Sequence, residues 1–263
     1  KGLNVWAEMY INALLSSPVT HMVNIVSNAL FGFFQLPERA LGGVIGAVRT
    51  NVFRGMPSSD RVYMEESFAM VQSLRLGMRD ALLAASRALK NEQETFGAMT
   101  KLDVQERRAI SADYLDIDRE KLPLVAKAVD GAGIFTRLLG SRLLLAEDEF
   151  AKGLAFQAEL YAQAVRRTKA AIHEGMDPEE AAETVGAKIL MGRDATATRT
   201  SQEMAQRLTF QQDLGPFAGK LQGLMAHPLA KILVPFFKTP TNLVKETLSR
   251  TPLAFFPGTG FWS

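Results

Sequence analysis

Hydrophobic residues recur at helical spacing along most of the chain, and no stretch alternates convincingly between polar and apolar residues. The clearest helix is expected from about Asp60 to Lys90, where apolar positions step alternately by four and three residues and only Arg75 interrupts them. The pattern predicts an all-α protein. It also predicts that this apolar face packs against other helices, through Phe68, Val71, Met78 and Leu82.

A second long helix is expected from roughly Ile134 to Glu174, with kinks near Gly140 and Gly153, after a polar and charged stretch from Asn91 to Leu122. Gly175 would end it, because glycine adopts the left-handed backbone that closes many helices.

Two further helix starts are signalled by capping residues. Asp177 precedes Pro178 and can accept backbone N–H groups, which predicts a helix from Pro178 to Met191. Thr200, with Glu203 three residues later, has the form of a capping box and predicts another start.

Prolines divide the last quarter of the chain, where Pro216, Pro228, Pro240 and Pro252 are spaced by 12 residues. The prediction is therefore one of long amphipathic helices followed by short, proline-delimited ones, assembled as an oligomer, because helices this short need another surface to lie on. Four segments are expected: 1–55, 56–122, 123–215 and 216–263.

A charge-free run of 29 residues extends from Met9 to Pro37, long enough for a bilayer-spanning helix. Its many Asn, Ser, Thr and Gln side chains would each need a partner in hydrocarbon, so core or subunit-interface helices and membrane contact both stay open. Gly42 and Gly46 form a small-xxx-small pair that permits close helix packing. Ser17 and Thr239 each precede a proline and are expected to cap helices.

The apolar segments near the two ends supply the candidate membrane or subunit contacts. These are Ile25, Leu30, Phe31, Phe33, Phe34, Leu233, Phe236, Phe237, Phe255, Phe256 and Trp262. An aromatic, glycine-rich end from Phe255 to Ser263 indicates a contact or a cut, and a first residue other than methionine indicates a piece of a longer protein.

The composition removes several function classes. Thirty Lys and Arg against 28 Asp and Glu leave a formal charge of +2, so no overall field favours nucleic acid, and the absence of cysteine excludes disulfides and thiolate sites. The sequence carries no recognisable catalytic motif: residues 215–221 lack the spacing of a phosphate-binding loop, and His21, His173 and His227 fit no metal-site pattern. We expect no enzyme, no cofactor and no metal, and we expect packing or capping roles for the histidines.

Two charged clusters are candidates for a function. The acidic cluster Glu147 to Glu149 is expected on a solvated or helix-pairing face, with Asp148 paired to Lys152. The small basic groups around Arg166, Lys169 and Arg193 could touch phosphates, which leaves non-specific DNA contact open.

Four segments of the sequence resemble blocks in very large bacteriophage proteins. They run from Leu14 to Asn24, Leu144 to Lys152, Val234 to Leu243 and Arg250 to Ala254, and together they extend over nearly the whole chain. The chain is similar to the internal virion, or DNA-ejection, proteins of short-tailed phages and to related large polyvalent phage proteins.

That resemblance implies a helical, non-enzymatic protein that is packed in the virion interior and then moves to the host cell envelope. There it would form a homo-oligomeric conduit for the genome with other virion proteins and contact the host membrane. Two alternatives stay open: a membrane-active, holin-like or toxin-like helical module, and a non-catalytic helical domain of a larger enzyme.

Overall fold

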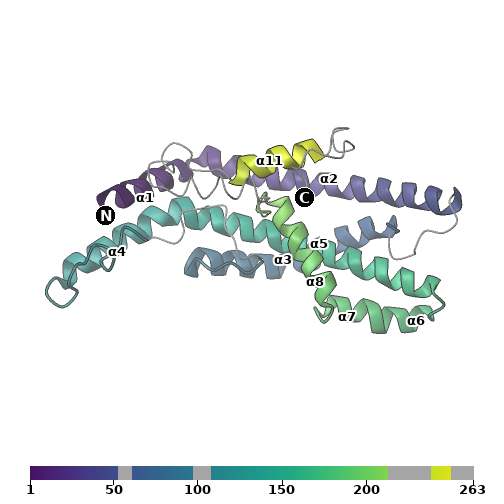
Figure 1. Ribbon diagram of the computed structural model, residues 1–263. Helices are drawn as coiled ribbons and strands as arrows, with labels where there is room; N and C mark the ends of the chain where they lie inside the picture. The colour runs from purple at the N-terminus through teal and green to yellow at the C-terminus, as the bar shows by residue number, and fades with distance from the viewer. Residues whose placement is uncertain (53–60, 97–107, 213–237, 250–263) are drawn as a thin grey trace. The chain divides into compact units, whose positions relative to one another are not determined.

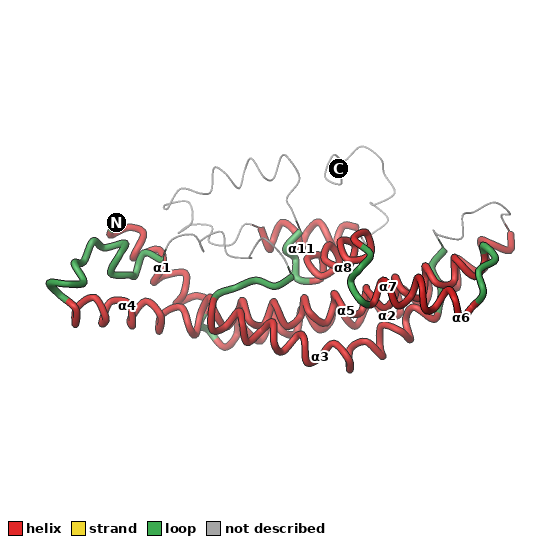
Figure 2. The backbone as a smooth tube through the Cα atoms, turned by 90° about the horizontal axis from the view of Figure 1, so that it is seen from below, coloured by secondary structure: helices red, strands yellow, loops and turns green. Residues whose placement is uncertain are grey.

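The computed structural model describes residues 1–52, 61–96, 108–212 and 238–249 (Figure 1). Within these ranges all regular structure is helical, as Figure 2 shows, so the predicted all-α class is confirmed. The longer helices are α1 (Gly2–Leu15), α2 (Pro18–Val52), α3 (Glu65–Asn91), α4 (Pro123–Arg137), α5 (Leu143–His173), α8 (Ala195–Leu208) and α11 (Lys238–Ser249).

The helix predicted from Asp60 to Lys90 corresponds to α3. The second long helix begins earlier than predicted, because α4 starts at Pro123 and runs through a short π-helical segment, η2 (Leu138–Arg142), into α5. Gly140 lies in that wider turn, where an added Cβ would come within 2.8 Å of the Asn12 carbonyl oxygen of α1. The predicted irregularity at Gly140 is therefore present, whereas Gly153 lies inside α5 without a break.

The helix cap predicted at Asp177 is confirmed. The Asp177 side chain accepts from the backbone N–H groups of Glu179 and Glu180 and starts α6 (Pro178–Ala181), which continues through η3 (Ala182–Gly186) and α7 (Ala187–Leu190). Gly175 and Gly192 both have positive φ, as expected of residues that end helices.

Three other predicted caps lie as follows. The cap predicted at Thr200 is wrong, because Thr200 lies inside α8. The N-cap of α8 is Asp194, whose side chain accepts from Ala197 N–H. Ser17 does directly precede α2, and its carbonyl oxygen accepts from His21 N–H at 3.4 Å. Thr239 lies in the first turn of α11 rather than before it. The remaining proline-delimited helices predicted for the tail fall outside the described residues.

The chain forms two compact units, which cut across the four sequential segments. Unit 1 consists of Lys1–Ile25, Ser86–Glu147 and Phe210–Ser263, and unit 2 of Val26–Ala85 and Asp148–Thr209. Helices α2, α3 and α5 contribute residues to both units.

In unit 1, α1 lies beside α4 and η2 (Figure 1). Ile11 and Leu15 of α1 pack on Leu144 at the start of α5, with Tyr10 at the edge of the cluster. This small apolar cluster is next to buried polar groups, because Glu8 and Asn12 on the same helix are also buried. The Asn12 side chain accepts from the backbone N–H of Ser141 at 3.0 Å, which satisfies a donor in the π-helical segment.

In unit 2, α5 is the helix on which the others pack. Phe31 of α2 and Leu208 of α8 meet Ala155, while Met70 of α3 and Leu36 of α2 meet Ala158 and Ala162. The hairpin partner of α5, formed by α6, η3 and α7, contributes Ile189 to a cluster with Leu160 and Ala164 (Figure 1). Alanines on α5 let the neighbouring helices approach closely, so the apolar core of this unit is thin.

Candidate interaction surface

Helix α3 buries mainly small residues, together with Met70 and Glu66, and exposes most of its large hydrophobic ones. The buried positions include Ser73, Gly77, Ala81, Ala84 and Ala88. Close approach explains this choice at Gly77, where an added Cβ would lie 2.6 Å from the side chain of Gln157 on α5. Apart from Met70 and Glu66, the buried side of α3 is therefore made mostly of small side chains.

The opposite side of α3 is the apolar face that the sequence pattern marked out. Its members are Phe68, Val71, Met78 and Leu82, together with Met64 directly before the helix, all exposed, with Phe68 at 69%. Within the described residues Phe68, Val71, Met78 and Leu82 are not buried against other helices of the chain, so their predicted role in helix packing stays a prediction. We call these five residues the α3 stripe.

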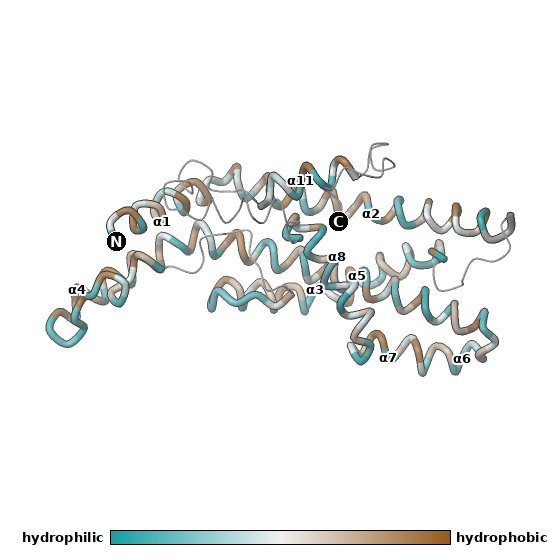
Figure 3. Tube along the Cα trace, viewed as in Figure 1, coloured by the Kyte–Doolittle hydropathy of each residue, from teal (hydrophilic) through white to brown (hydrophobic). Residues whose placement is uncertain are grey.

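In unit 2, helix α2 is inverted in the same sense: its large hydrophobic residues are exposed and polar residues lie on its inward side. Its outward residues in that unit are Val26, Leu30, Phe33, Phe34, Leu41, Val44, Ile45 and Val48, all exposed. We call these residues the α2 stripe; Figure 3 shows hydrophobic positions along much of this helix. The inward side carries polar groups, among them Asn28, Gln35 and Arg39.

Four of the predicted contact residues lie on the exposed side of α2. Ile25, Leu30, Phe33 and Phe34 are each at least half exposed, whereas Phe31 faces inward and packs on Ala155 and Leu208. The other six predicted contacts, Leu233, Phe236, Phe237, Phe255, Phe256 and Trp262, lie outside the described residues.

The predicted packing glycines of α2 lie against the segment that leads into α3. A Cβ at Gly42 would make ordinary contact with the Val62 side chain at 3.6 Å, while one at Gly46 would lie 3.0 Å from the Val62 carbonyl oxygen. The tightest position is the neighbouring Gly43, where a Cβ would lie 2.5 Å from the backbone nitrogen of Met64. Gly46 therefore lies at a close approach, whereas Gly42 makes only ordinary contact, and the neighbouring backbone at residues 61–63 is not helical. Gly43 was not predicted.

Charged side chains occupy the interior of unit 2. Glu66 at the start of α3 is fully buried and accepts two hydrogen bonds from Arg166 of α5, Nε to Oε1 at 3.0 Å and Nη2 to Oε2 at 2.7 Å. Arg39 of α2 lies 3.6 Å from the same carboxylate and also pairs with Glu159 of α5. Gln163 donates to the other oxygen of Glu159 at 2.8 Å. Two arginines and two carboxylates therefore join three helices.

This network was missed at the sequence level, although a signal existed. Lys152, Glu159, Gln163 and Arg166 follow Glu149 at spacings of three, seven, four and three residues, which places them on one side of a helix. A polar stripe with both charge signs is usually solvated, and here it is buried instead.

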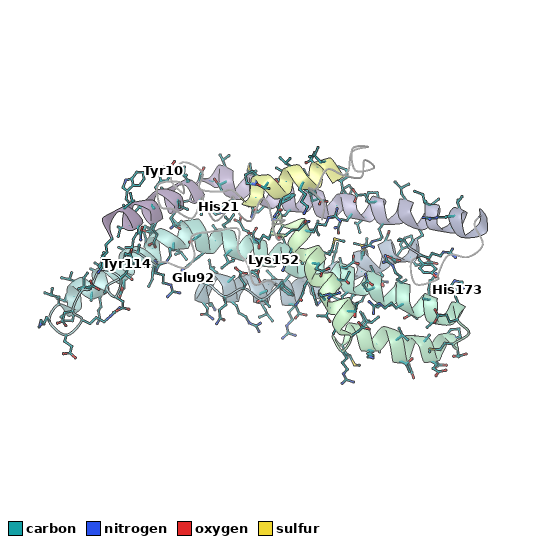
Figure 4. All side chains as sticks on the ribbon, viewed as in Figure 1. Tyr10, His21, Glu92, Tyr114, Lys152 and His173 are labelled. Atoms are coloured by element: carbon teal, nitrogen blue, oxygen red, sulfur yellow. The ribbon has the colours of Figure 1, made fainter. Side chains whose placement is uncertain are left out.

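The acidic cluster at the start of this stripe is also largely buried, so of the two faces expected for it, solvated or helix-pairing, the solvated one is excluded. Asp148 and Glu149 are at most 1% exposed, and the fully buried Lys152, labelled in Figure 4, donates to Glu149 at 2.8 Å rather than to Asp148. Lys152 and Glu149 thus compensate each other's charge in the interior, where a buried charge without its partner would be strongly destabilising.

A second charged cluster lies in unit 1 around Glu92, directly after α3 (Figure 4). Its carboxylate contacts Arg108 at 2.9 Å, Arg137 at 3.3 Å and Arg142 at 2.5 Å. Arg137 in turn donates to the buried Glu8 of α1 at 2.7 Å. The cluster ties α1, the end of α3 and the α4–η2 junction together.

Two of the three histidines have packing roles, as expected. His21 is buried in unit 1, with Nε2 2.9 Å from the Leu139 carbonyl oxygen and Nδ1 2.8 Å from Glu147. His173 stacks on the ring of Tyr63 at the end of α5. His227 lies outside the described residues.

Among the described residues no group of His, Asp and Glu side chains is arranged to hold a metal ion. None of the described helices combines the length and hydrophobicity needed to cross a bilayer. Comparison with protein-family models, with curated proteins and with solved structures finds no match to this chain. The two exposed stripes are therefore the features of the described chain that point most directly to a function.

Proposed function

We propose that this chain is a structural, non-enzymatic part of a phage internal virion, or DNA-ejection, protein, and that its exposed apolar stripes pack against further copies to form an oligomeric conduit for the genome. On this proposal it resides in the virion interior and acts in the host cell envelope after ejection. The four sequence blocks that resemble this family support the proposal, and the inverted helices carry it.

The inverted helices favour an assembly role for a physical reason. Fully burying one large hydrophobic side chain contributes about 1.5–3 kcal/mol, and the two stripes leave thirteen of them in water. A contiguous apolar face of this kind marks a surface that another molecule covers. Both stripes follow heptad-like spacing, which suits helix-on-helix contact between subunits.

The experiment that tests the proposal is the particle mass of the chain by light scattering, in buffer and then in mild detergent or lipid nanodiscs. A discrete multimer supports the conduit. A monomer under every condition contradicts it, and insertion of the α2 segment alone into liposomes, measured by flotation, would favour the membrane-active module instead.

Matched variants connect that result to the α3 stripe. Phe68→Glu places a charge at the most exposed large residue of the stripe, and Gln72→Glu places the same charge at an exposed polar position one turn away. The first variant is expected to abolish the multimer while the monomer keeps its helix content, and the second to leave the multimer intact. Equal effects of the two variants would exclude the stripe as the contact.

A further inference from the structure

The hydroxyl group of Tyr63 is buried without a hydrogen-bond partner. Tyr63 immediately precedes the turn into α3 in unit 2 and is only 4% exposed, and its Oη has no partner. Burying a hydroxyl without a partner is unfavourable, so such a group in a folded protein calls for an explanation, and a bound ion or water is one.

A second unpartnered donor lies two residues away. The Nε of Arg61 is buried and makes no hydrogen bond, and its guanidinium carbon lies 4.9 Å from the centre of the Tyr63 ring. The Nζ of Lys169 lies 5.1 Å from the same ring centre, and the imidazole of His173 stacks on the ring at 6.1 Å. Besides its own orphan hydroxyl, the Tyr63 side chain thus has one orphan donor, Arg61 Nε, and a further cation, Lys169, beside its ring.

The acidic groups nearby are already engaged. Glu65 pairs with Lys169, and Glu66 accepts both hydrogen bonds from Arg166. The hydrogen bond from Lys169 lowers the pKa of Glu65, so that carboxylate stays ionised and bound to its lysine. Among the described side chains, Arg61 is left with a positive charge and no ion pair.

The state of Tyr63 also favours donation. Burial raises the pKa of its phenol above the ordinary value, an effect larger than the opposing field of Arg61, so the hydroxyl keeps its proton at neutral pH. The position of the residue is fixed by its backbone, since Tyr63 N–H donates to Glu66 Oε1 at 2.9 Å and Gly43 of α2 admits the following peptide. Both donors therefore belong to a positioned segment.

We propose that Arg61 Nε and Tyr63 Oη bind a small oxyanion of the phosphate class, with Lys169 adding a favourable field. A tetrahedral oxyanion offers acceptors to both orphan donors and neutralises the unpaired guanidinium charge, whereas a water molecule supplies acceptors without charge. The burial of Tyr63 favours a free anion over the backbone phosphates of a nucleic acid. This site is independent of the proposed conduit.

The test uses the full chain and inorganic phosphate, measured by isothermal titration and by thermal unfolding against chloride of equal ionic strength. The variants are Tyr63→Phe and Arg61→Gln, and Arg75→Gln on the exposed side of α3 is the control that removes a similar charge elsewhere. Phosphate is expected to raise the melting temperature of the wild type and of Arg75→Gln alike. Both site variants are expected to bind phosphate at least about tenfold more weakly.

Tyr63→Phe separates ligand binding from a structural role. Because it removes an unpaired buried hydroxyl, this variant should be at least as stable as the wild type in chloride and yet lose the gain in phosphate. The proposal is overturned if phosphate stabilises all four proteins equally or none of them, or if Tyr63→Phe weakens binding of a short DNA duplex as much as it weakens binding of inorganic phosphate.

Discussion

Glu92 and Arg142 lie 2.5 Å apart, Oε1 to Nε, and Glu92 holds this position with a left-handed backbone, φ 56°. A residue other than glycine adopts that conformation at a cost, which the surrounding structure must offset. Arg108 and Arg137 contact the same carboxylate. Three guanidinium groups on one carboxylate thus hold the end of α3 within unit 1.

Replacing Glu92 by Gln should destabilise the protein by about 2–3 kcal/mol, because it leaves partly buried arginines without their counter-charge. Chemical denaturation of the full chain measures the free energy of unfolding. Glu120→Gln is the control, since Glu120 is exposed in the same unit, and it should change stability by no more than about 0.5 kcal/mol. Similar losses in both variants would show that the cluster contributes nothing specific.

The same carboxylate predicts the pH dependence of stability. Burial alone would raise the pKa of Glu92, but Arg142, Arg108 and Arg137 outweigh it and hold this pKa below its ordinary value. Since the folded state then binds the proton less tightly than the unfolded state, the stabilisation is complete above the unfolded-state pKa of about 4.3 and is lost as pH falls through the folded value.

Denaturation at a series of pH values checks this sign. The difference in the free energy of unfolding between the wild type and Glu92→Gln should be constant from about pH 6 to pH 8 and should shrink below about pH 4. A difference as large at pH 3 as at pH 7 would contradict the assigned role of the carboxylate.

Two neighbouring carboxylates in unit 2 should behave very differently. Glu66 is fully buried and bound by Arg166 and Arg39, whereas the Glu65 side chain is 56% exposed beside Lys169. Glu66→Gln should cost about 3 kcal/mol because it leaves buried arginines without their counter-charge, while Glu65→Gln should cost at most about 1 kcal/mol, as for other surface pairs. Thermal and chemical unfolding of the two variants measure the difference, and equal losses would contradict the buried network.

The helices themselves were predictable because apolar periodicity and capping signals are local. The face that α3 buries was not, because the heptad pattern marks the most hydrophobic side of a helix and says nothing about what covers it. In this chain Ser73, Gly77 and Ala81 are buried, with Gly77 against α5, and the hydrophobic side of α3 is left exposed. The pairing of Arg39 with Glu159 could not be predicted from local patterns either, because the two residues are 120 positions apart in the sequence.

The start of α8 illustrates how two local signals compete. Asp194 and Thr200 can both cap a helix, and the structure uses Asp194, whose carboxylate accepts from Ala197 N–H at 2.8 Å and from Arg167 at 2.9 Å. The backbone hydrogen bond from Ala197 lowers the pKa of Asp194, a further sign that the carboxylate is bound as an anion.

Asp194→Ala should therefore reduce stability by about 1 kcal/mol or more, and Thr200→Ala should leave it unchanged or slightly higher, because alanine is favourable inside a helix. Circular dichroism during thermal unfolding compares the two variants. A larger loss of stability in Thr200→Ala than in Asp194→Ala would instead indicate that the helix begins at Thr200, as the sequence predicted.

Replacing either of two glycines of α2 by alanine should change the stability of the protein in opposite directions. An added Cβ at Gly43 would lie 2.5 Å from the backbone nitrogen of Met64, and backbone cannot move aside as a flexible side chain can. Nothing lies within 4 Å of the corresponding position at Gly32. Gly32→Ala should stabilise the protein by about 0.5–1 kcal/mol through helix propensity alone. Gly43→Ala gains the same propensity but must separate α2 from the entry into α3, so it should destabilise the protein by about 1–3 kcal/mol. Unfolding in denaturant measures both, and stabilisation by Gly43→Ala would mean that α2 and residues 63–64 are not held together as closely as this structure has them.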